Sequence, residues 1–232
     1  MPRRLLLISN STNHGQGYLD HALSEIDAFL GLVRSLLFVP FALQDRQGYG
    51  KKVRDRLAAG VEVRTLAADE AGRRMIQQAE AVFTGGGNTF RLLKTLQDSG
   101  LLPVLRERAL AGIPYIGSSA GTNIAAPTIR TTNDMPIVQP ASFDALGLVP
   151  FQINPHYIDA EPNSTHMGET REQRLKEFHE ENTTPVVGLR EGAWIRVEGG
   201  HATLGGARGA RIFRQGQEPE ERRTADVLDD LL

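Results

Sequence analysis

The first half of the chain alternates between short apolar runs and longer stretches with helical spacing. The apolar runs, which we interpret as strands, cover residues 4–10, 35–42, 61–67, 81–87 and 113–117. The helical stretches cover residues 18–31, 46–59, 69–80, 88–100 and about 103–111. Strand–helix alternation predicts an α/β fold in which helices cover both faces of a mostly parallel sheet. In such sheets, ligands bind beyond the carboxyl ends of the strands.

The second half of the chain has shorter and less regular patterns. Residues 127–138 and 151–157 are extended pieces that contain proline, which predicts loops and edge strands. Residues 168–182 form a charged amphipathic pattern with Thr170 as a suitable helix cap. This part of the chain therefore adds one helix and little regular sheet.

The C-terminal region is rich in glycine turns. Residues 185–216 predict three or four short strands, which we interpret as a small β-meander. From about residue 217 the chain has the composition of a polar tail with one weak helix. No repeat or linker interrupts the sequence, so we expect a single α/β domain over residues 1–232.

The composition excludes several classes of function. A net charge of −2 gives no electrostatic reason to expect nucleic acid or an anionic membrane as a partner. The absence of cysteine removes disulfides, thiolate metal sites and a cysteine nucleophile. Only four apolar residues follow the first arginines, which is short for an export signal, and no apolar run reaches the ~18 residues of a membrane span. We therefore expect a cytoplasmic protein.

Residues 115–123, YIGSSAGTN, contain the pattern Gly117-x-Ser119-x-Gly121 directly after an apolar run. Flanking glycines allow the sharp strand-to-helix turn that presents a serine as a nucleophile, because no Cβ atom clashes in the strained backbone. The alternative is an ordinary loop of small residues. The pattern makes Ser119 the candidate nucleophile if the chain also supplies a base.

His156 is the strongest candidate for that base. It follows Pro155 in the sequence INPHY, where proline restricts the backbone and thereby the direction of the imidazole. His14 follows the first predicted strand and is a second candidate. His21 and His179 lie in amphipathic patterns and are predicted to be surface residues.

Two carboxylates could orient the imidazole of His156. Asp134 lies in the polar turn TTNDMP, and Glu191 lies at a glycine turn between two apolar runs. A triad can use either one, because triads are defined by geometry and not by chain order. The spacing of the residues leaves both open.

The glycine loop GGGNT, residues 85–89, has two interpretations. It could hold a phosphate at a helix N-terminus, although it lacks the lysine of a P-loop and the spacing of a dinucleotide site. It could instead supply an oxyanion hole, with one N–H from the region of Gly87 and one from Ala120, which follows the candidate nucleophile. The histidine spacing suggests no metal site, and we expect no metal and no cofactor.

Six segments, in order, give the chain a specific resemblance. They are GGGNTFRLLK, YIGSSAGTN, PTIRTTNDMPIV, INPHY, GETREQR and GLREGAWI. Together they resemble the peptidase E family of serine peptidases, family S51, and the similarity runs from LLLISNST to ATLGG. The resemblance implies a fold like flavodoxin and the class I glutamine amidotransferases. It also implies hydrolysis of dipeptides that begin with an α-aspartyl residue, so the expected partner is a small Asp-Xaa peptide.

The resemblance also implies roles for particular residues. It implies Ser119 as nucleophile, His156 as base and Gly87 as an oxyanion-hole glycine. The family has carried proposals for both acids. We favour Glu191 as the acid in contact with His156, and give Asp134 a part in building the site.

Substrate recognition is implied in the same way. Arg171 in GETREQR matches an arginine that can bind the aspartyl carboxylate in a bidentate manner, and Asn88 of GGGNT is assigned to substrate binding with it. One position departs from the pattern, since enteric members carry tryptophan where this chain has Ser118. We expect that change to alter the pocket wall and the preference for the leaving residue.

Several alternatives remain beside this prediction. A β-aspartyl or cyanophycinase-like peptidase of the same broad family, or an esterase, would use the same serine turn. A non-catalytic flavodoxin-like binder would use the glycine loop for phosphate or flavin. The oligomeric state is predicted only as monomer or homodimer.

Overall fold

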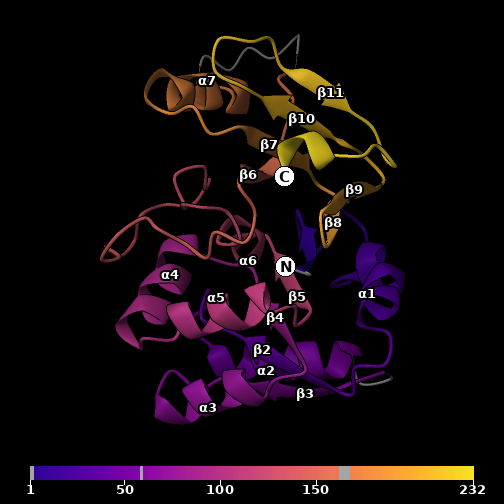
Figure 1. The fold of residues 1–232 in the computed structure, drawn as a ribbon, viewed down its shortest axis with the longest axis vertical. Helices are drawn as coiled ribbons and strands as arrows, with labels where there is room; N and C mark the ends of the chain where they lie inside the picture. The colour runs from indigo at the N-terminus through magenta and orange to yellow at the C-terminus, as the bar shows by residue number, and fades with distance from the viewer. Residues whose placement is uncertain (1–2, 58–59, 162–167) are drawn as a thin grey trace.

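The computed structural model describes residues 3–57, 60–161 and 168–232. Its main sheet has seven strands, and in Figure 1 it extends from the bottom of the molecule to about mid-height. In spatial order they are β3 (Glu62–Thr65), β2 (Ser35–Val39), β4 (Ala81–Thr84), β5 (Tyr115–Ser118), β1 (Arg4–Ile8), β8 (Ala193–Glu198) and β9 (His201–Gly206). The five strands from β3 to β1 are parallel, whereas β8 and β9 extend the sheet by antiparallel pairing. The predicted α/β fold with a mostly parallel sheet is confirmed.

Helices cover both faces of this sheet. One face packs against α1 (Leu23–Leu30), which the short 3-10 helix η1 (Asp20–Ala22) precedes, and against α2 (Arg46–Leu57). The other face packs against α3 (Glu70–Gln78), α4 (Thr89–Asp98), α5 (Leu102–Leu110) and the short α6 (Ala120–Asn123). Alternate strand residues point to opposite faces, which is why neighbouring side chains of one strand belong to separate cores.

A second sheet lies above the first in Figure 1, next to α7 (Arg171–Glu181). Its strands, in order, are β11 (Glu220–Arg222), β10 (Ala210–Phe213), β7 (Val186–Arg190) and β6 (Gln152–Tyr157). Leu175 of α7 packs with Tyr157 and Phe213 of this sheet. Thr170 caps α7 as predicted, since its hydroxyl accepts the Gln173 N–H and the Gln173 side chain accepts the Thr170 N–H.

The predicted β-meander over residues 185–216 is wrong in its pairing. β7 and β10 pair with each other in the second sheet, and the hairpin of β8 and β9 belongs to the main sheet. The chain crosses between sheets at the turn of Glu191 and Gly192, where Gly192 has a positive φ of 80°. Sequence patterns identify strands but not the strands with which they pair. Here β8 pairs with β1 in the main sheet, whereas β10 pairs with β7 in the second sheet.

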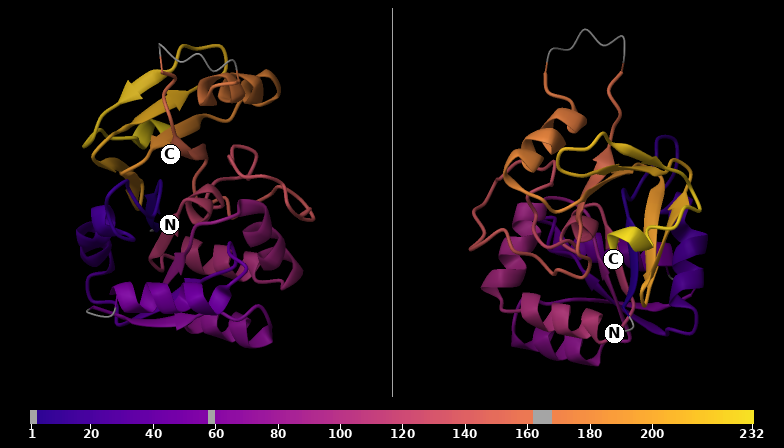
Figure 2. Two further views of the ribbon diagram at one scale, coloured as in Figure 1. Left: turned by 180° about the vertical axis from the view of Figure 1, so that it is seen from behind. Right: turned by 45° about the horizontal axis from the view of Figure 1, so that its top comes forward.

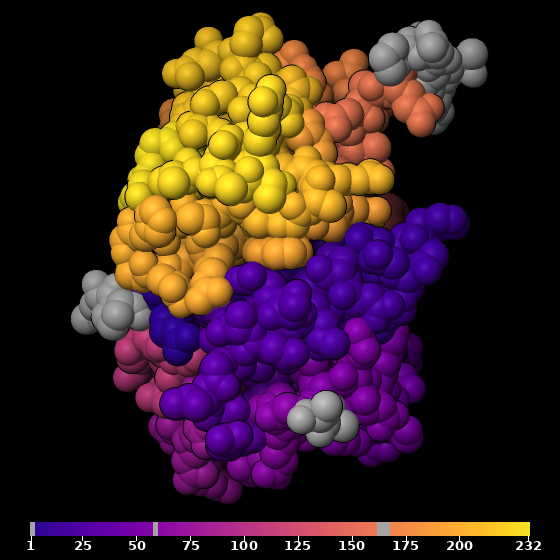
Figure 3. Space-filling view, turned by 90° about the vertical axis from the view of Figure 1, so that its right-hand side faces the viewer, coloured from indigo at the N-terminus to yellow at the C-terminus, as the bar shows by residue number. Residues whose placement is uncertain are grey.

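The region from residue 217, predicted to be a polar tail with a weak helix, is folded onto the protein. It supplies β11 and the 3-10 helix η2 (Asp229–Leu231). Leu228 and Leu231 are buried in the large core, which explains why the tail does not extend into solvent. In Figure 3 the yellow C-terminal residues lie against the orange residues that precede them in the chain.

The carboxyl ends of β4, β5 and β1 meet at one edge of the sheet. Thr84 pairs with Gly117, and Ser118 pairs with Ile8, so the loops after these strands are neighbours. Figure 2 shows the second sheet standing over this edge of the main sheet. In the described part of the chain, no helix has the length and apolar character needed to cross a membrane.

Candidate active site

Ser119 lies in a strained turn between β5 and α6. Its backbone has φ 53° and ψ −108°, a conformation that non-glycine residues rarely adopt. The turn is held by the Ser119 N–H, which donates to Ile8 O at 3.0 Å. A Cβ atom on Gly121 would collide with Thr84 O, so the chain needs glycine here for close packing against β4. The predicted sharp strand-to-helix turn is therefore present.

The imidazole of His156 joins Ser119 to Glu191. His156 Nε2 lies 3.0 Å from Ser119 Oγ, and His156 Nδ1 lies 2.7 Å from Glu191 Oε1. A carboxylate can only accept, so Nδ1 carries the proton and Nε2 accepts from the serine hydroxyl. This tautomer prepares Nε2 to take the serine proton.

The backbone at His156 is itself fixed by an unusual conformation. His156 has φ 54° and lies where the pairing of β6 with β7 shifts register. Its N–H donates to Ser9 Oγ at 2.9 Å, and the Ser9 hydroxyl donates to Leu189 O. Ser9 thus ties β1, β6 and β7 together and aims the imidazole at the serine turn.

Glu191 reaches His156 from the turn between β7 and β8. The Gly192 N–H in this turn donates to Asn10 Oδ1 at 2.8 Å, which ties the turn to the end of β1. The side chains of His156 and Glu191 are 38% and 43% exposed, so water reaches the pair. Ser119, His156 and Glu191 therefore form a hydrogen-bonded chain that is accessible to solvent at this edge of the sheet.

Asp134 does not take part in this chain. Its Oδ2 accepts from the Thr89 N–H at 2.7 Å and from the Thr89 hydroxyl at 2.6 Å, and it also contacts the Thr132 hydroxyl. Asp134 therefore neutralises the N-terminus of α4 and borders the pocket of Ser119. The structure brings Glu191, not Asp134, to His156.

Asn88 is the cap of the same helix. Its Oδ1 accepts the Arg91 N–H at 3.0 Å, and its Nδ2 donates to Met135 O at 2.8 Å. Both the oxygen and the nitrogen of the amide are hydrogen-bonded within the protein, and Asn88 is not among the residues that line the pocket. The structure thus places it where it holds the loop around Asp134 against α4.

Two glycines bring the backbone against the serine. A Cβ atom on Gly86 would lie 3.0 Å from Ser119 Cβ, which shows how closely this loop approaches the nucleophile candidate. Gly87 has φ 131°, and a Cβ atom there would lie 2.7 Å from Ala42 O. The Gly87 N–H donates to no acceptor within the described ranges.

Ala120 supplies a second backbone N–H next to the serine. It is the first residue of α6, and a first helical residue has no acceptor within its helix. The N–H groups of Gly87 and Ala120 are the two donors that the sequence suggested for an oxyanion hole.

A pocket of about 570 Å³ lies over Ser119. Among the described residues, it contains two carboxylates, Asp45 and Asp134, and one ammonium group, that of Lys52. Tyr18 and Tyr49 line it too, with hydroxyl groups 3.4 Å apart, and burial raises the pKa of both phenols. The remaining lining residues are Ser11, Leu43, Gly48, Gly86, Gly87, Ser119 and His156.

Arg171 lies in a neighbouring pocket of about 470 Å³ at the start of α7. Burial lowers the pKa of Arg171, repulsion from Arg174 lowers it further, and the Asp134 carboxylate opposes both effects. Asp134, which contributes this effect, lines the serine pocket. Asn133 lines the same neighbouring pocket, and its amide donates to Pro155 O, directly before His156.

Other predicted positions have different environments. His14 is exposed and absent from the pocket lining, and Ser118 is fully buried and absent from it too. Ser118 follows the alternation of β5 and points to the same face as Ile116, so it does not form the pocket wall that we expected. The surface positions predicted for His21 and His179 are also wrong. His179 is buried at 7% exposure and His21 is partly buried.

Sequence patterns did not indicate three residues at this site. Ser9, Tyr49 and Lys52 become relevant only because β1, β6 and α2 meet at the same edge. The polar residues that follow the first strand include Ser11, and they were the sequence feature that could have indicated the N-terminal part of the pocket.

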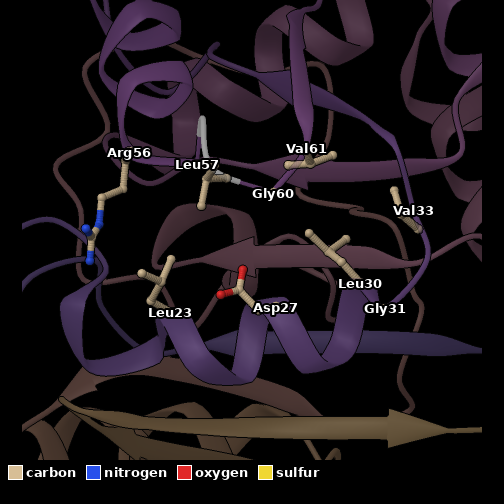
Figure 4. A pocket seen from close by; sticks show the side chains of 9 residues that line it. All are labelled: Leu23, Asp27, Leu30, Gly31, Val33, Arg56, Leu57, Gly60 and Val61. Carbon is tan, nitrogen blue, oxygen red and sulfur yellow. The ribbon is translucent and has the colours of Figure 1, made fainter.

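A smaller pocket of about 200 Å³ lies between α1 and the end of α2, and Figure 4 shows its lining. Its charged side chains are Asp27 and Arg56, and Arg56 is paired with Asp20. It contains none of the predicted site residues. Among the described residues, no three His, Asp or Glu side chains converge as a metal site would require.

Comparison with known proteins agrees with this geometry. Residues 5–205 match the family model of peptidase family S51. The chain is 56% identical to a peptidase E of Streptomyces coelicolor, over 98% of this chain and 94% of that protein. It is 49% identical to a protein of Drosophila melanogaster named "Probable alpha-aspartyl dipeptidase", over 94% and 93% of the two chains.

A solved structure shows the same fold at low sequence identity. It is a peptidase from an acI-B1 actinobacterium, with a TM-score of 0.71 and 16% identity, over 98% of this chain and 97% of that one. The family match spans most of the chain and contains Ser119, His156 and Glu191. This protein belongs to peptidase family S51.

Proposed function

We propose that this peptidase is a serine dipeptidase that hydrolyses dipeptides with an N-terminal α-aspartyl residue. The observation that best supports the proposal is the hydrogen-bonded chain Ser119–His156–Glu191, which lies next to the backbone N–H groups of Gly87 and Ala120. The names of two relatives, peptidase E and probable alpha-aspartyl dipeptidase, support the substrate class.

Ser119 is the nucleophile in the proposed reaction. His156 Nε2 takes the hydroxyl proton while Ser119 Oγ attacks the aspartyl carbonyl carbon. The N–H groups of Gly87 and Ala120 stabilise the oxyanion, and each such donor contributes roughly 3–4 kcal/mol in acyl transfer. The partial positive charge at the start of α6 acts in the same direction.

The second half of the reaction uses the same groups. The tetrahedral intermediate collapses, the peptide C–N bond breaks, and protonated His156 gives its proton to the leaving amine. Water then attacks the aspartyl ester of Ser119, with His156 as base, and aspartate is released. Glu191 holds the Nδ1 proton and stabilises the imidazolium in both steps.

Selectivity for the aspartyl carboxylate is assigned to Arg171, and binding of the substrate ammonium group is assigned to Asp134. Among the described residues, no carboxylate pairs with the partly buried guanidinium of Arg171, which can therefore bind a substrate carboxylate. The carboxylate of Asp134 borders the catalytic pocket, where the substrate ammonium group is expected. A neutral side chain would leave the guanidinium unpaired, so asparagine peptides are rejected. Cytoplasmic location and the choice between monomer and homodimer stay predictions from the sequence.

The test compares four dipeptides. We expect kcat/KM to be highest on Asp-Leu, far lower on Glu-Leu and Asn-Leu, and lowest on β-Asp-Leu. Ser119→Ala is expected to abolish hydrolysis and to retain the thermal unfolding temperature. A preference for β-Asp-Leu would favour the cyanophycinase-like alternative, and faster hydrolysis of uncharged acyl esters would favour the esterase.

A further inference from the structure

Lys52 brings an ammonium group into the pocket that contains Ser119. It lies on α2, and its Nζ lies 4.3 Å from the centroid of the Tyr18 ring. This is the geometry of a cation–π contact, which holds a flexible lysine side chain in one direction. Lys51, the preceding residue, instead pairs with Asp55 and does not line the pocket.

The surroundings of Lys52 leave its charge available to a ligand. Burial raises the pKa of Tyr18 and Tyr49, so both phenols stay neutral at physiological pH. Asp45 also lines the pocket, but its Oδ1 accepts the Gly48 N–H at 2.8 Å. Within the described ranges, no carboxylate forms an ion pair with Lys52 at 4.0 Å or less.

Lys52 and Asp134 are associated with opposite faces of the main sheet. Tyr49 and Val53, which flank Lys52 on α2, pack in the core shared with α1. Asp134 instead holds the first residue of α4, and α4 packs on the other face. Ser119 lies at the sheet edge between these faces.

The charges of the substrate match this division. In an α-aspartyl dipeptide, the residue before the scissile bond has an ammonium group and a side-chain carboxylate. The residue after that bond contributes one obligatory charge, its terminal carboxylate. If Asp134 binds the ammonium group of the first residue, the terminal carboxylate of the leaving residue lies on the opposite side of the scissile bond. A cation is needed there, and Lys52 supplies an ammonium group on that side of the pocket.

We propose that Lys52, held by Tyr18, binds the terminal carboxylate of the leaving residue. This inference rests on the proposed dipeptidase function and assigns the leaving-residue subsite to the α2 side of the pocket. It explains how the enzyme would select for dipeptides, because a longer peptide or a C-terminal amide moves or removes the negative charge that Lys52 recognises.

The test uses Asp-Leu and its C-terminal amide as paired substrates. A hydrogen bond to a charged group changes kcat/KM by about 10- to 100-fold, so we expect the native protein to prefer the free acid by that factor. Lys52→Met is expected to remove this preference by lowering kcat/KM on Asp-Leu while activity on the amide is retained. Lys52→Arg keeps the charge and is expected to keep most of the preference.

Lys51→Met is the matched control, because it removes one lysine charge from the same helix outside the pocket. It is expected to behave as the native protein on both substrates. Equal kcat/KM on the acid and the amide in the native protein, or an unchanged preference in Lys52→Met, overturns the assignment of Lys52. Failure of the native protein to hydrolyse any α-aspartyl peptide instead overturns the proposed function.

Discussion

Nδ1 of His156 lies 2.7 Å from Oε1 of Glu191, and this contact orients the imidazole toward Ser119. Asp134, the other acid that the sequence offered, has its Oδ2 bonded to the N–H and hydroxyl groups of Thr89. The two acids therefore have different roles in the site. One acts on the base directly, and the other builds the α4 side of the pocket.

The first prediction separates these two acids. Glu191→Gln removes the charge that holds the Nδ1 proton, so kcat is expected to fall on the order of 10³- to 10⁴-fold with little change in unfolding temperature. Asp134→Asn leaves the contact of His156 with Glu191 intact and is expected to raise KM and weaken α4 capping. Steady-state kinetics on Asp-Leu measure both variants, and a larger loss of kcat in Asp134→Asn would reverse the assignment.

The second prediction concerns the backbone donor at Gly87. An alanine Cβ would lie 2.7 Å from Ala42 O, and the φ of 131° is strained for alanine, so the loop must move. We expect Gly87→Ala to lower kcat by about 10²- to 10³-fold, as loss of one oxyanion-hole donor does. Circular dichroism is expected to show a folded variant, so that the loss of kcat can be assigned to the oxyanion-hole donor.

Gly216→Ala is the control for a positive φ without crowding. Gly216 has φ 69° and no atom within 4 Å of the added Cβ. We expect a small loss of stability and unchanged kinetics. Equal kinetic losses in both glycine variants would mean that a general loosening of the fold, rather than the oxyanion loop, causes the effect at Gly87.

The third prediction concerns the aspartyl carboxylate. Arg171→Met is expected to lower kcat/KM on Asp-Leu by about 10- to 100-fold, because it removes a charged hydrogen-bond partner, and to leave the slow hydrolysis of Asn-Leu nearly unchanged. Arg174→Met removes a neighbouring guanidinium that pairs with Glu169 and serves as control. Retention of the preference for Asp-Leu in Arg171→Met would rule out this residue as the specificity determinant.

The fourth prediction concerns the pH dependence of stability. Burial lowers the pKa of His21, and the nearby Asn10 carbonyl and the carboxylates of Asp20 and Glu191 oppose this only in part. The unfolded chain therefore binds a proton at higher pH than the folded one. The stability of the fold therefore decreases as the pH falls below about 6.5, the ordinary pKa of histidine. Once the pH is below the lowered pKa of His21 in the folded protein, this group causes no further loss.

His21→Gln is expected to flatten that dependence. The urea midpoint of the variant should change less between pH 7.5 and pH 5.5 than that of the native protein. His14→Gln, at an exposed position, is expected to retain the native dependence. The same loss of midpoint on acidification in His21→Gln as in the native protein would assign the acid sensitivity to other groups.

Local patterns in the sequence determined the elements and the position of the serine. Alternating apolar runs and helical spacing predicted the sheet and its helices, because each strand and helix must bury one side. Glycines on both sides of Ser119 predicted the turn, because the pattern Gly117-x-Ser119-x-Gly121 follows directly after an apolar run. These features depend on neighbours along the chain, so the sequence alone reveals them.

Only the tertiary structure decided which distant groups meet. His156 is 37 residues from Ser119 and 35 from Glu191, and the register of β6, β7 and β8 brings the three together. The placement of Lys52 beside the serine, and of Arg171 in a separate pocket, depends equally on how α2 and α7 pack. Contacts of this kind are set by strand order and crossing between sheets, which local residue patterns do not encode.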